Sequence, residues 1–294
     1  MSNLDLRPLS LGEILDRTFT LYRRHFLLFL GISAIPRLPL VAIQVAQAVL
    51  LIAARPDSAH GDPSGLYTWA ATHSDAFEGI MMSIALLILI LTLVAYLLAE
   101  GATVFSVSEL YLGNTITIRQ SFSRMRGNML TLLGVLILNG LAIGAATILL
   151  IIPGIWLACR LLVVIPVALL EGEGPRGSLS RSMRLTQDYA GSAFLILLLY
   201  YAVVMAAAML FTAPFQAAQY FDTVKHCGSP KIWAALTQVG ASISAILVVP
   251  ILTIASSIFY FDLRIRKEGL DLQMMLRDEQ PQTTLPGGVP TMFT

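Results

Sequence analysis

Charged residues are scarce in this sequence. Asp, Glu, Lys and Arg together make up 13% of its 294 residues, whereas soluble proteins contain about 25%. Hydrophobic residues reach 56%, and the mean hydropathy is +0.75. A single core in a chain of this length cannot hide so much apolar surface from water. The composition therefore excludes a water-soluble enzyme and a disordered protein, and it indicates a membrane protein.

Several kinds of site are also without support. Two cysteines are too few for a disulfide scaffold. A net charge of +1 gives no electrostatic reason to expect a nucleic acid partner. The four histidines are scattered, and no spacing places two of them on one helix face as metal ligands. Without a Gly-rich phosphate loop or a nucleophile elbow, we expect no cofactor, no metal, no catalytic residues and no enzymatic activity.

Six runs are long and apolar enough to cross a bilayer, which requires about 20 mostly apolar residues. They are residues 26–54, 80–112, 129–152, 154–170, 191–213 and 233–261. Pro153 and Gly154 separate the third run from the fourth and predict a tight helical hairpin there. The sequence therefore predicts an all-α polytopic membrane protein with six transmembrane helices. Residues 1–272 form its single membrane domain, and residues 273–294 are expected to be a disordered cytoplasmic tail.

Basic residues are distributed unequally between the two sides of the predicted membrane. Fourteen of the 19 Lys and Arg residues lie on one side, whereas only Arg55, Lys225 and Lys231 lie on the other. Lys and Arg accumulate in cytoplasmic loops. We therefore expect a multi-pass protein with both termini in the cytoplasm and two longer outer loops, at about residues 55–79 and 214–232.

A basic amphipathic helix is predicted before the first, third and fifth runs. Ser10 and Glu13 have capping-box spacing before the first, as do Thr117 and Gln120 before the third, and Pro175 begins the last. The chain is therefore interpreted as three possible repeats of an interfacial helix followed by a helical hairpin. The candidate contacts to phospholipid headgroups are Arg17, Arg23, Arg24, Arg124, Arg126, Arg181 and Arg184. Topology alone would leave the same arginines on this side, and that alternative stays open.

Three ionisable residues fall inside the predicted spans and form a candidate polar patch. They are Arg37, Glu100 and Arg160. An unpaired charge at this depth costs about 3 kcal/mol, so each should find a partner or water. Glu100 is the natural counter-ion, and it can pair with Arg37, the better match in depth, or with Arg160. The patch either lines a path for an anionic substrate or lipid headgroup, or it is an ion pair that fixes helix register, or its arginines extend toward the interface.

Several short runs occur in order along the chain. They are LRPLSLGEILDRTF with YRRHF at residues 6–26, PGIWLACR at 153–160, LSRSMRLT at 179–186 and YFDLRIRKEGLDL at 260–272. Together they resemble the bacterial glycerophosphoryl diester phosphodiesterase membrane-domain family over about residues 6–272. The resemblance implies a location in the bacterial cytoplasmic (inner) membrane. Some relatives carry a fused phosphodiesterase barrel, for which no soluble segment here is long enough, so the resemblance implies no such activity.

Three functions are compatible with these features. The first hypothesis is a non-catalytic scaffold or accessory protein that organises phospholipid or a partner protein, where the partner is another protein or a second copy of this chain in a homo-oligomer. The alternative is a small transporter or channel for an anionic or lipid-like substrate, since such proteins use repeats and buried charges. A lipid-modifying enzyme comes third. A water-filled cavity that reaches Glu100 would favour transport, whereas a closed bundle would favour the scaffold.

The predicted topology can be tested with reporters fused after residues 65 and 180. We expect activity from the periplasmic reporter only at residue 65 and from the cytoplasmic reporter only at residue 180, because an odd number of spans separates the two positions. A fusion after residue 270 serves as a cytoplasmic control. Activity of one reporter at both positions would contradict the topology.

Overall fold

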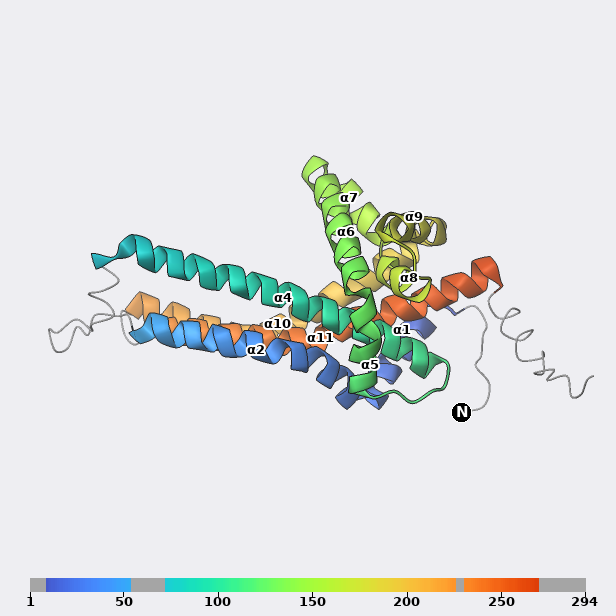
Figure 1. Ribbon diagram of the computed structural model, residues 1–294. Helices are drawn as coiled ribbons and strands as arrows, with labels where there is room; N and C mark the ends of the chain where they lie inside the picture. Colours follow the sequence, from blue (N-terminus) through green and yellow to red (C-terminus); the bar gives the residue numbers. More distant parts are fainter. Residues whose placement is uncertain (1–8, 54–71, 226–229, 270–294) are drawn as a thin grey trace, which may run out of the picture.

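The computed structural model describes residues 9–53, 72–225 and 230–269, and these ranges are helical with no strand. The helices are α1 (Leu11–Arg24), α2 (Phe26–Ala53), α4 (Ser74–Tyr111), α5 (Ile118–Met125), η1 (Arg126–Asn128), α6 (Met129–Leu149), α7 (Ile151–Arg160), α8 (Val164–Leu170), α9 (Pro175–Leu185), α10 (Ala190–Lys225) and α11 (Pro230–Glu268). Figure 1 shows their arrangement. The all-α prediction is confirmed.

Six helical segments are long and apolar enough to cross a membrane. They are Phe26–Gln47, Ser74–Tyr111, Ile118–Leu149, Ile151–Leu170, Ala190–Val224 and Ile232–Glu268. Each coincides with one of the runs predicted from the sequence. The chain is therefore an all-α polytopic membrane protein, as predicted.

The long helices α2, α4, α10 and α11 lie side by side in a bundle (Figure 1), in which α11 contacts the other three. At one end of the bundle, α1, α5, α8 and α9 gather around the last turns of α4 and α11. We call this end the base. The hairpin formed by α6 and α7 leaves the bundle near the base and points away from it, in a direction crosswise to the bundle's long axis.

The most densely packed part of the protein is the base. Phe259 and Tyr260 of α11 are buried there with Ile14 of α1, Phe29 of α2 and Leu185 of α9. Away from the base, the long helices turn large apolar side chains outward. Burial of apolar side chains therefore fixes the helices at one end, whereas the remainder of the bundle presents the kind of surface that lipid covers.

The break between the third and fourth runs differs from the prediction. The chain turns at Leu150, not at Pro153 and Gly154, and Pro153 lies in the first turn of α7. The end of α6 before Pro153 avoids contact of the proline ring with the carbonyl of Leu149, whereas α2, α10 and α11 continue through their prolines. Gly154 is needed for close packing of the hairpin, because a Cβ there would lie 2.8 Å from the Cα of Thr147.

The fourth run, residues 154–170, is not one continuous helix. Residues 161–163 interrupt it and separate α7 from α8. Pro166 favours the interruption, because a helix through this residue would bring its ring against the carbonyl of Leu162. The second piece, α8, packs into the base, where Val167 is fully buried.

The two outer loops are shorter than predicted. Helix α4 already begins at Ser74, and α10 continues through Pro214 to Lys225, so most of the loop predicted at 214–232 is helical. Gly240 of α11 packs closely on this part of α10, since a Cβ there would lie 2.2 Å from the carbonyl oxygen of Phe211. This contact supports α10 where its proline interrupts the hydrogen bonding. Residues 54–71, 226–229 and the predicted disordered tail at 273–294 lie outside the described residues.

A short helix precedes each helical hairpin at the positions predicted. These helices are α1, α5 and α9, and both predicted capping boxes are present, at Ser10 with Glu13 and at Thr117 with Gln120. In α1, however, Thr18 is buried within the protein, and the helix packs against α11. One face of α1 is thus a protein contact, and contact of its other face with the membrane interface stays a prediction.

The start of α1 is fixed to the far end of the chain. Asp262 of α11 accepts a hydrogen bond from the Leu9 backbone nitrogen at 2.7 Å and one from Arg266 Nε at 2.8 Å. The Arg266 guanidinium also donates to the Leu9 carbonyl oxygen. Both Leu9 and Asp262 are buried, so the hydrogen bond between them forms away from water, whereas the one from Arg266 is only partly buried.

Replacing Asp262 with Ala should destabilise the protein, because a buried backbone N–H and a guanidinium would lose their acceptor. We expect a loss of about 2 kcal/mol, measured as a lower unfolding temperature in detergent. Asp16→Ala, in the exposed part of α1, is the matched control and should change the unfolding temperature little. Equal effects of the two substitutions would contradict the assigned role of Asp262.

Candidate functional site

A buried polar cluster joins three helices within the bundle. Glu100 of α4 is 5% exposed and accepts a hydrogen bond from Thr253 Oγ1 of α11 at 2.7 Å. A second hydrogen bond links it to Tyr96, one turn earlier in α4. Arg37 of α2 is also buried, with 8% of its surface exposed. A carboxylate and a guanidinium are thus enclosed in the same apolar bundle.

Arg37 and Glu100 interact electrostatically. The guanidinium donates a hydrogen bond to the Ser33 carbonyl oxygen of its own helix at 3.1 Å, whereas the described hydrogen bonds to the carboxylate come from hydroxyl groups. Tyr200 of α10 also interacts electrostatically with Glu100. Groups from all four long helices therefore surround this one carboxylate.

The structure places the third predicted member of the patch elsewhere. Arg160 ends α7, and its guanidinium donates to the Met183 carbonyl oxygen of α9 at 2.6 Å. Its own carbonyl oxygen accepts from Ser182 and Thr186 at 2.9 Å each. A cation is favourable near the C-terminal carbonyls of a helix. Arg160 therefore fastens the hairpin to α9, and it is not among the groups that act on Glu100.

The predicted headgroup arginines have different surroundings. Arg124 forms an ion pair with Glu109. Arg181 is bound by two carboxylates within the protein, and it is therefore not free for a lipid. Arg23, Arg126 and Arg184 are exposed, as is Arg24, whereas Arg17 is half-buried. Contact between these arginines and phospholipid stays a prediction.

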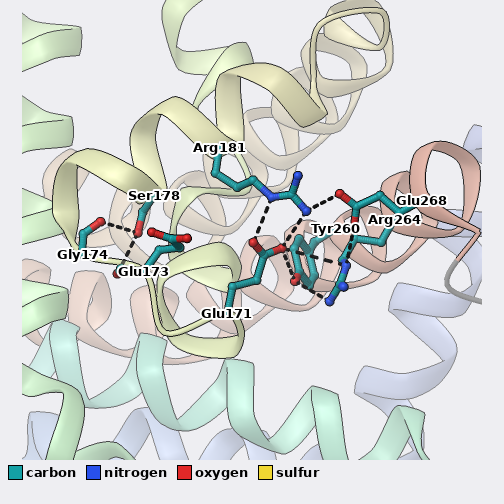
Figure 2. Close-up of polar contacts among 8 residues, drawn as sticks. All are labelled: Glu171, Glu173, Gly174, Ser178, Arg181, Tyr260, Arg264 and Glu268. Atoms are coloured by element: carbon teal, nitrogen blue, oxygen red, sulfur yellow. Dashed lines mark hydrogen bonds and ion pairs between the residues drawn. The ribbon is translucent and has the colours of Figure 1, made fainter. Parts of the chain in front are cut away.

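A cluster of ion pairs in the base was not predicted (Figure 2). The Glu171 carboxylate, directly after α8, accepts from Arg181 Nε at 2.9 Å and from the Tyr260 hydroxyl at 2.8 Å. Arg181 also binds Glu268 near the end of α11, and Arg264 Nε lies 3.0 Å from the same carboxylate. We call Glu171, Arg181, Tyr260, Arg264 and Glu268 the base cluster. It ties α8, α9 and α11 together.

The hydrogen bond with Glu171 raises the pKa of the Arg181 guanidinium, which therefore remains charged at any pH the protein meets. Both carboxylates of the base cluster are engaged by arginines, so neither is free to act as a general base. In the described ranges, no group of three His, Cys, Asp or Glu side chains could hold a metal ion. The arrangement is suited to fixing helices rather than to proton transfer.

The start of α9 is stabilised by its own neighbours (Figure 2). The Ser178 hydroxyl donates to the carbonyl oxygens of Glu173 and Gly174 at 3.1 and 2.9 Å. The Glu173 carboxylate lies over Gly177, where a Cβ would be 2.4 Å from its Oε2. A negative charge at this end of a helix is favourable. The helix terminus that could attract an anion is therefore already occupied by the protein's own carboxylate.

An open groove of about 520 Å³ lies beside this helix start. It is lined by Gly134, Ile137 and Leu138 of α6 and by residues 174–177. A smaller pocket lies between α1, α10 and α11, beside Thr18. Arg37 and Glu100 line neither of these two hollows, although Tyr200, which interacts with Glu100, lines the smaller one.

Comparisons with known proteins do not identify the chain. No known protein family, curated protein or solved structure matches it. Three features described above bear on function: a buried charged cluster in the bundle, carboxylates paired with arginines in the base, and a hairpin attached to α9 through Arg160.

The base residues missed from the sequence gave partial signals. Arg264 with Glu268 has a spacing of four residues, as does Asp262 with Arg266, and this spacing is typical of ion pairs along one helix. Glu171 gave no such signal, because its partners Arg181, Tyr260 and Arg264 lie 10 to 93 positions further along the chain. Because membrane topology alone accounts for arginines on this side, the sequence offered no separate reason to expect that these arginines also take part in packing.

Coupling between Arg37 and Glu100 can be measured with single and double substitutions to Gln. Glu100→Gln leaves the buried arginine without its counter-charge, which should cost up to about 3 kcal/mol. The double variant with Arg37→Gln should recover part of this loss, read as unfolding temperature and as yield of inserted protein. Glu78→Gln, in the exposed part of the same helix, is the control. A double variant no more stable than Glu100→Gln would refute the coupling.

Proposed function

We propose that this chain is a non-catalytic scaffold of the bacterial cytoplasmic membrane that organises lipid or a partner protein. The observation that carries the proposal is the α6–α7 hairpin, which projects from the bundle (Figure 1) and is hydrogen-bonded to α9 of the base through Arg160. Leu130 is 84% exposed and Leu141 66% exposed on α6. Such side chains do not contribute to the fold, so they are available to lipid or to another membrane protein.

The surroundings of the buried charges favour a scaffold over a transporter. Transport needs a path along which a substrate or ion reaches the buried polar groups. Arg37 and Glu100 are buried, and neither of them lines either of the two hollows described above. The buried pair itself is the observation that favours a transporter for an anionic or lipid-like substrate, and this remains the second candidate.

We also propose that the chain belongs to the bacterial glycerophosphoryl diester phosphodiesterase membrane-domain family, without the phosphodiesterase activity. Support comes from where the four runs behind that resemblance lie. Asp262 of the last run binds Leu9 of the first, and Arg160 of the second binds Met183 of the third. Runs far apart in the sequence thus meet in the base. Such contacts are expected if the members of a family share these runs because the runs hold the same fold together.

The scaffold function can be tested by purification in mild detergent, with mass spectrometry of co-purifying lipids and polypeptides. A variant with Leu130, Leu141 and Ile148 changed to Ala should lose a ligand that the wild-type protein retains, because these exposed side chains lie on the hairpin. The matched control changes Leu86, Leu89 and Met209 to Ala, which are exposed on the bundle. This variant should retain the ligand.

Two results would count against the scaffold. One is the absence of any lipid or polypeptide enriched over an unrelated polytopic protein. The other is flux of an anionic solute into proteoliposomes that is abolished by Glu100→Gln, which would favour the transporter.

A further inference from the structure

Both ends of the α6–α7 hairpin are fixed to the base. At its start, Met129 packs in an apolar cluster with Val104 of α4 and Met125 of α5. At its end, Arg160 is hydrogen-bonded to α9 through both its guanidinium and its carbonyl oxygen. Between these two points Val135 of α6 is fully buried against α8, so the free part of the hairpin leaves and returns beside the short helices of the base, on the predicted cytoplasmic side.

The distance from this attachment to the hairpin's turn is too short for a membrane crossing. Helix α7 contains 10 residues, which corresponds to about 15 Å at 1.5 Å per residue. Helix α6 is held in the base through the fully buried Val135, and its remaining residues, 136–149, correspond to about 21 Å. The hydrocarbon core of a bilayer is about 30 Å thick. With Arg160 held at the base, the turn at Leu150 can reach only about the middle of the membrane, even if α7 stood upright.

The turn itself has the chemistry of a buried segment. Five successive apolar residues, Ile148 to Ile152, form it, and their exposed fractions range from 63 to 89%. The whole stretch 129–159 contains no charged residue. By contrast, the segment that joins the first two spans contains Arg55, Asp57 and Asp62. A turn that emerged into water would not be expected to present five large aliphatic side chains in succession.

The backbone of the turn also suits hydrocarbon. The Leu150 nitrogen donates to the Ala146 carbonyl oxygen at 3.0 Å, and the Gly154 nitrogen donates to the Leu150 carbonyl oxygen at 3.3 Å. Pro153 has no N–H to satisfy. Backbone groups within the hydrocarbon must find partners in the protein, and the turn meets part of this demand through its own geometry.

We propose that the α6–α7 hairpin does not cross the membrane but enters the leaflet on the side of the base and turns back within it. Its ligand is then the acyl-chain layer of that leaflet, into which it inserts as an apolar arm. The direction of the hairpin across the bundle's axis (Figure 1) fits this placement. The inference deepens the proposed function and, where it names lipid as the ligand, rests on it. The bias of basic residues is equally compatible, because a crossing hairpin and a returning one leave the same arginines on the same side.

Cysteine labelling of the full-length protein tests this placement. In a background with Cys159→Ala and Cys227→Ala, single cysteines are introduced at Ile148 or at Leu149. Thr223→Cys at the outer end of α10 and Ser123→Cys in α5, both exposed, are the controls. A membrane-impermeant maleimide is applied to intact cells and to inside-out vesicles, and unfolding temperatures verify that each variant folds.

We expect the maleimide to label Thr223→Cys only in intact cells and Ser123→Cys only in inside-out vesicles, and to label neither tip variant in either preparation. A spin label on each tip variant should then be accessible to oxygen and not to a water-soluble nickel complex, at a depth within the half of the bilayer nearer the base. Labelling of a tip cysteine in intact cells, or a depth in the opposite leaflet, would show a crossing hairpin. Labelling in inside-out vesicles would show an arm in water. Either result overturns the proposal.

The outcome is separate from that of the scaffold test. Topology is read on the protein alone, so a returning hairpin remains established if no ligand co-purifies and only the scaffold function fails. Conversely, loss of a bound polypeptide from the hairpin variant together with outer labelling of the tip would support a scaffold and refute the leaflet arm.

Discussion

The fold depends on the cost of a charge or backbone polar group that lacks a partner in an apolar medium. At the depth of the bundle, water cannot supply the missing hydrogen bonds, so the chain supplies them itself. Glu100 accepts from Thr253 and interacts with Arg37 of a third helix. Each such group restricts which helices can be neighbours. The few charges that enter the bundle therefore specify its arrangement, whereas lipid-like apolar surfaces cannot.

The same constraint acts at the base, where the chain concentrates its ion pairs. Hydrocarbon offers no hydrophobic drive for helices to associate, and the outer parts of the long helices are mostly exposed to it. The base has a packed apolar core that includes Tyr260. The hydroxyl group of Tyr260 donates to Glu171, which is in turn paired with Arg181. The hairpin's attachment through Arg160 lies within the same assembly. We infer that the base sets the positions of the helices that extend from it.

Whether a feature of this structure can be predicted from the sequence depends on how far apart its interacting residues lie along the chain. Hydropathy and capping boxes are local signals, so they located all six apolar segments and the helix that begins after Ser10. The effect of a proline on a helix is also local. The break was nevertheless expected at Pro153, whereas the chain turns at Leu150, before the proline. The depth estimate favoured Arg37 as the partner of Glu100, and the two groups interact electrostatically. It failed for Arg160, because the interruption of the fourth run, and hence the position of α9, depends on tertiary packing.

The hairpin shows why apolar length alone does not define a membrane span. Composition reports whether a segment can reside in hydrocarbon, and residues 129–160 satisfy that requirement whichever way they run. A crossing also requires the far end to be free to reach the opposite surface. In this protein the contacts of Arg160 with Met183, Ser182 and Thr186 hold that end at the base, so a hydrogen-bonded attachment, rather than hydrophobicity, limits how deep the turn can lie. The same apolar sequence released from α9 would have the length, in α6 alone, to cross the bilayer.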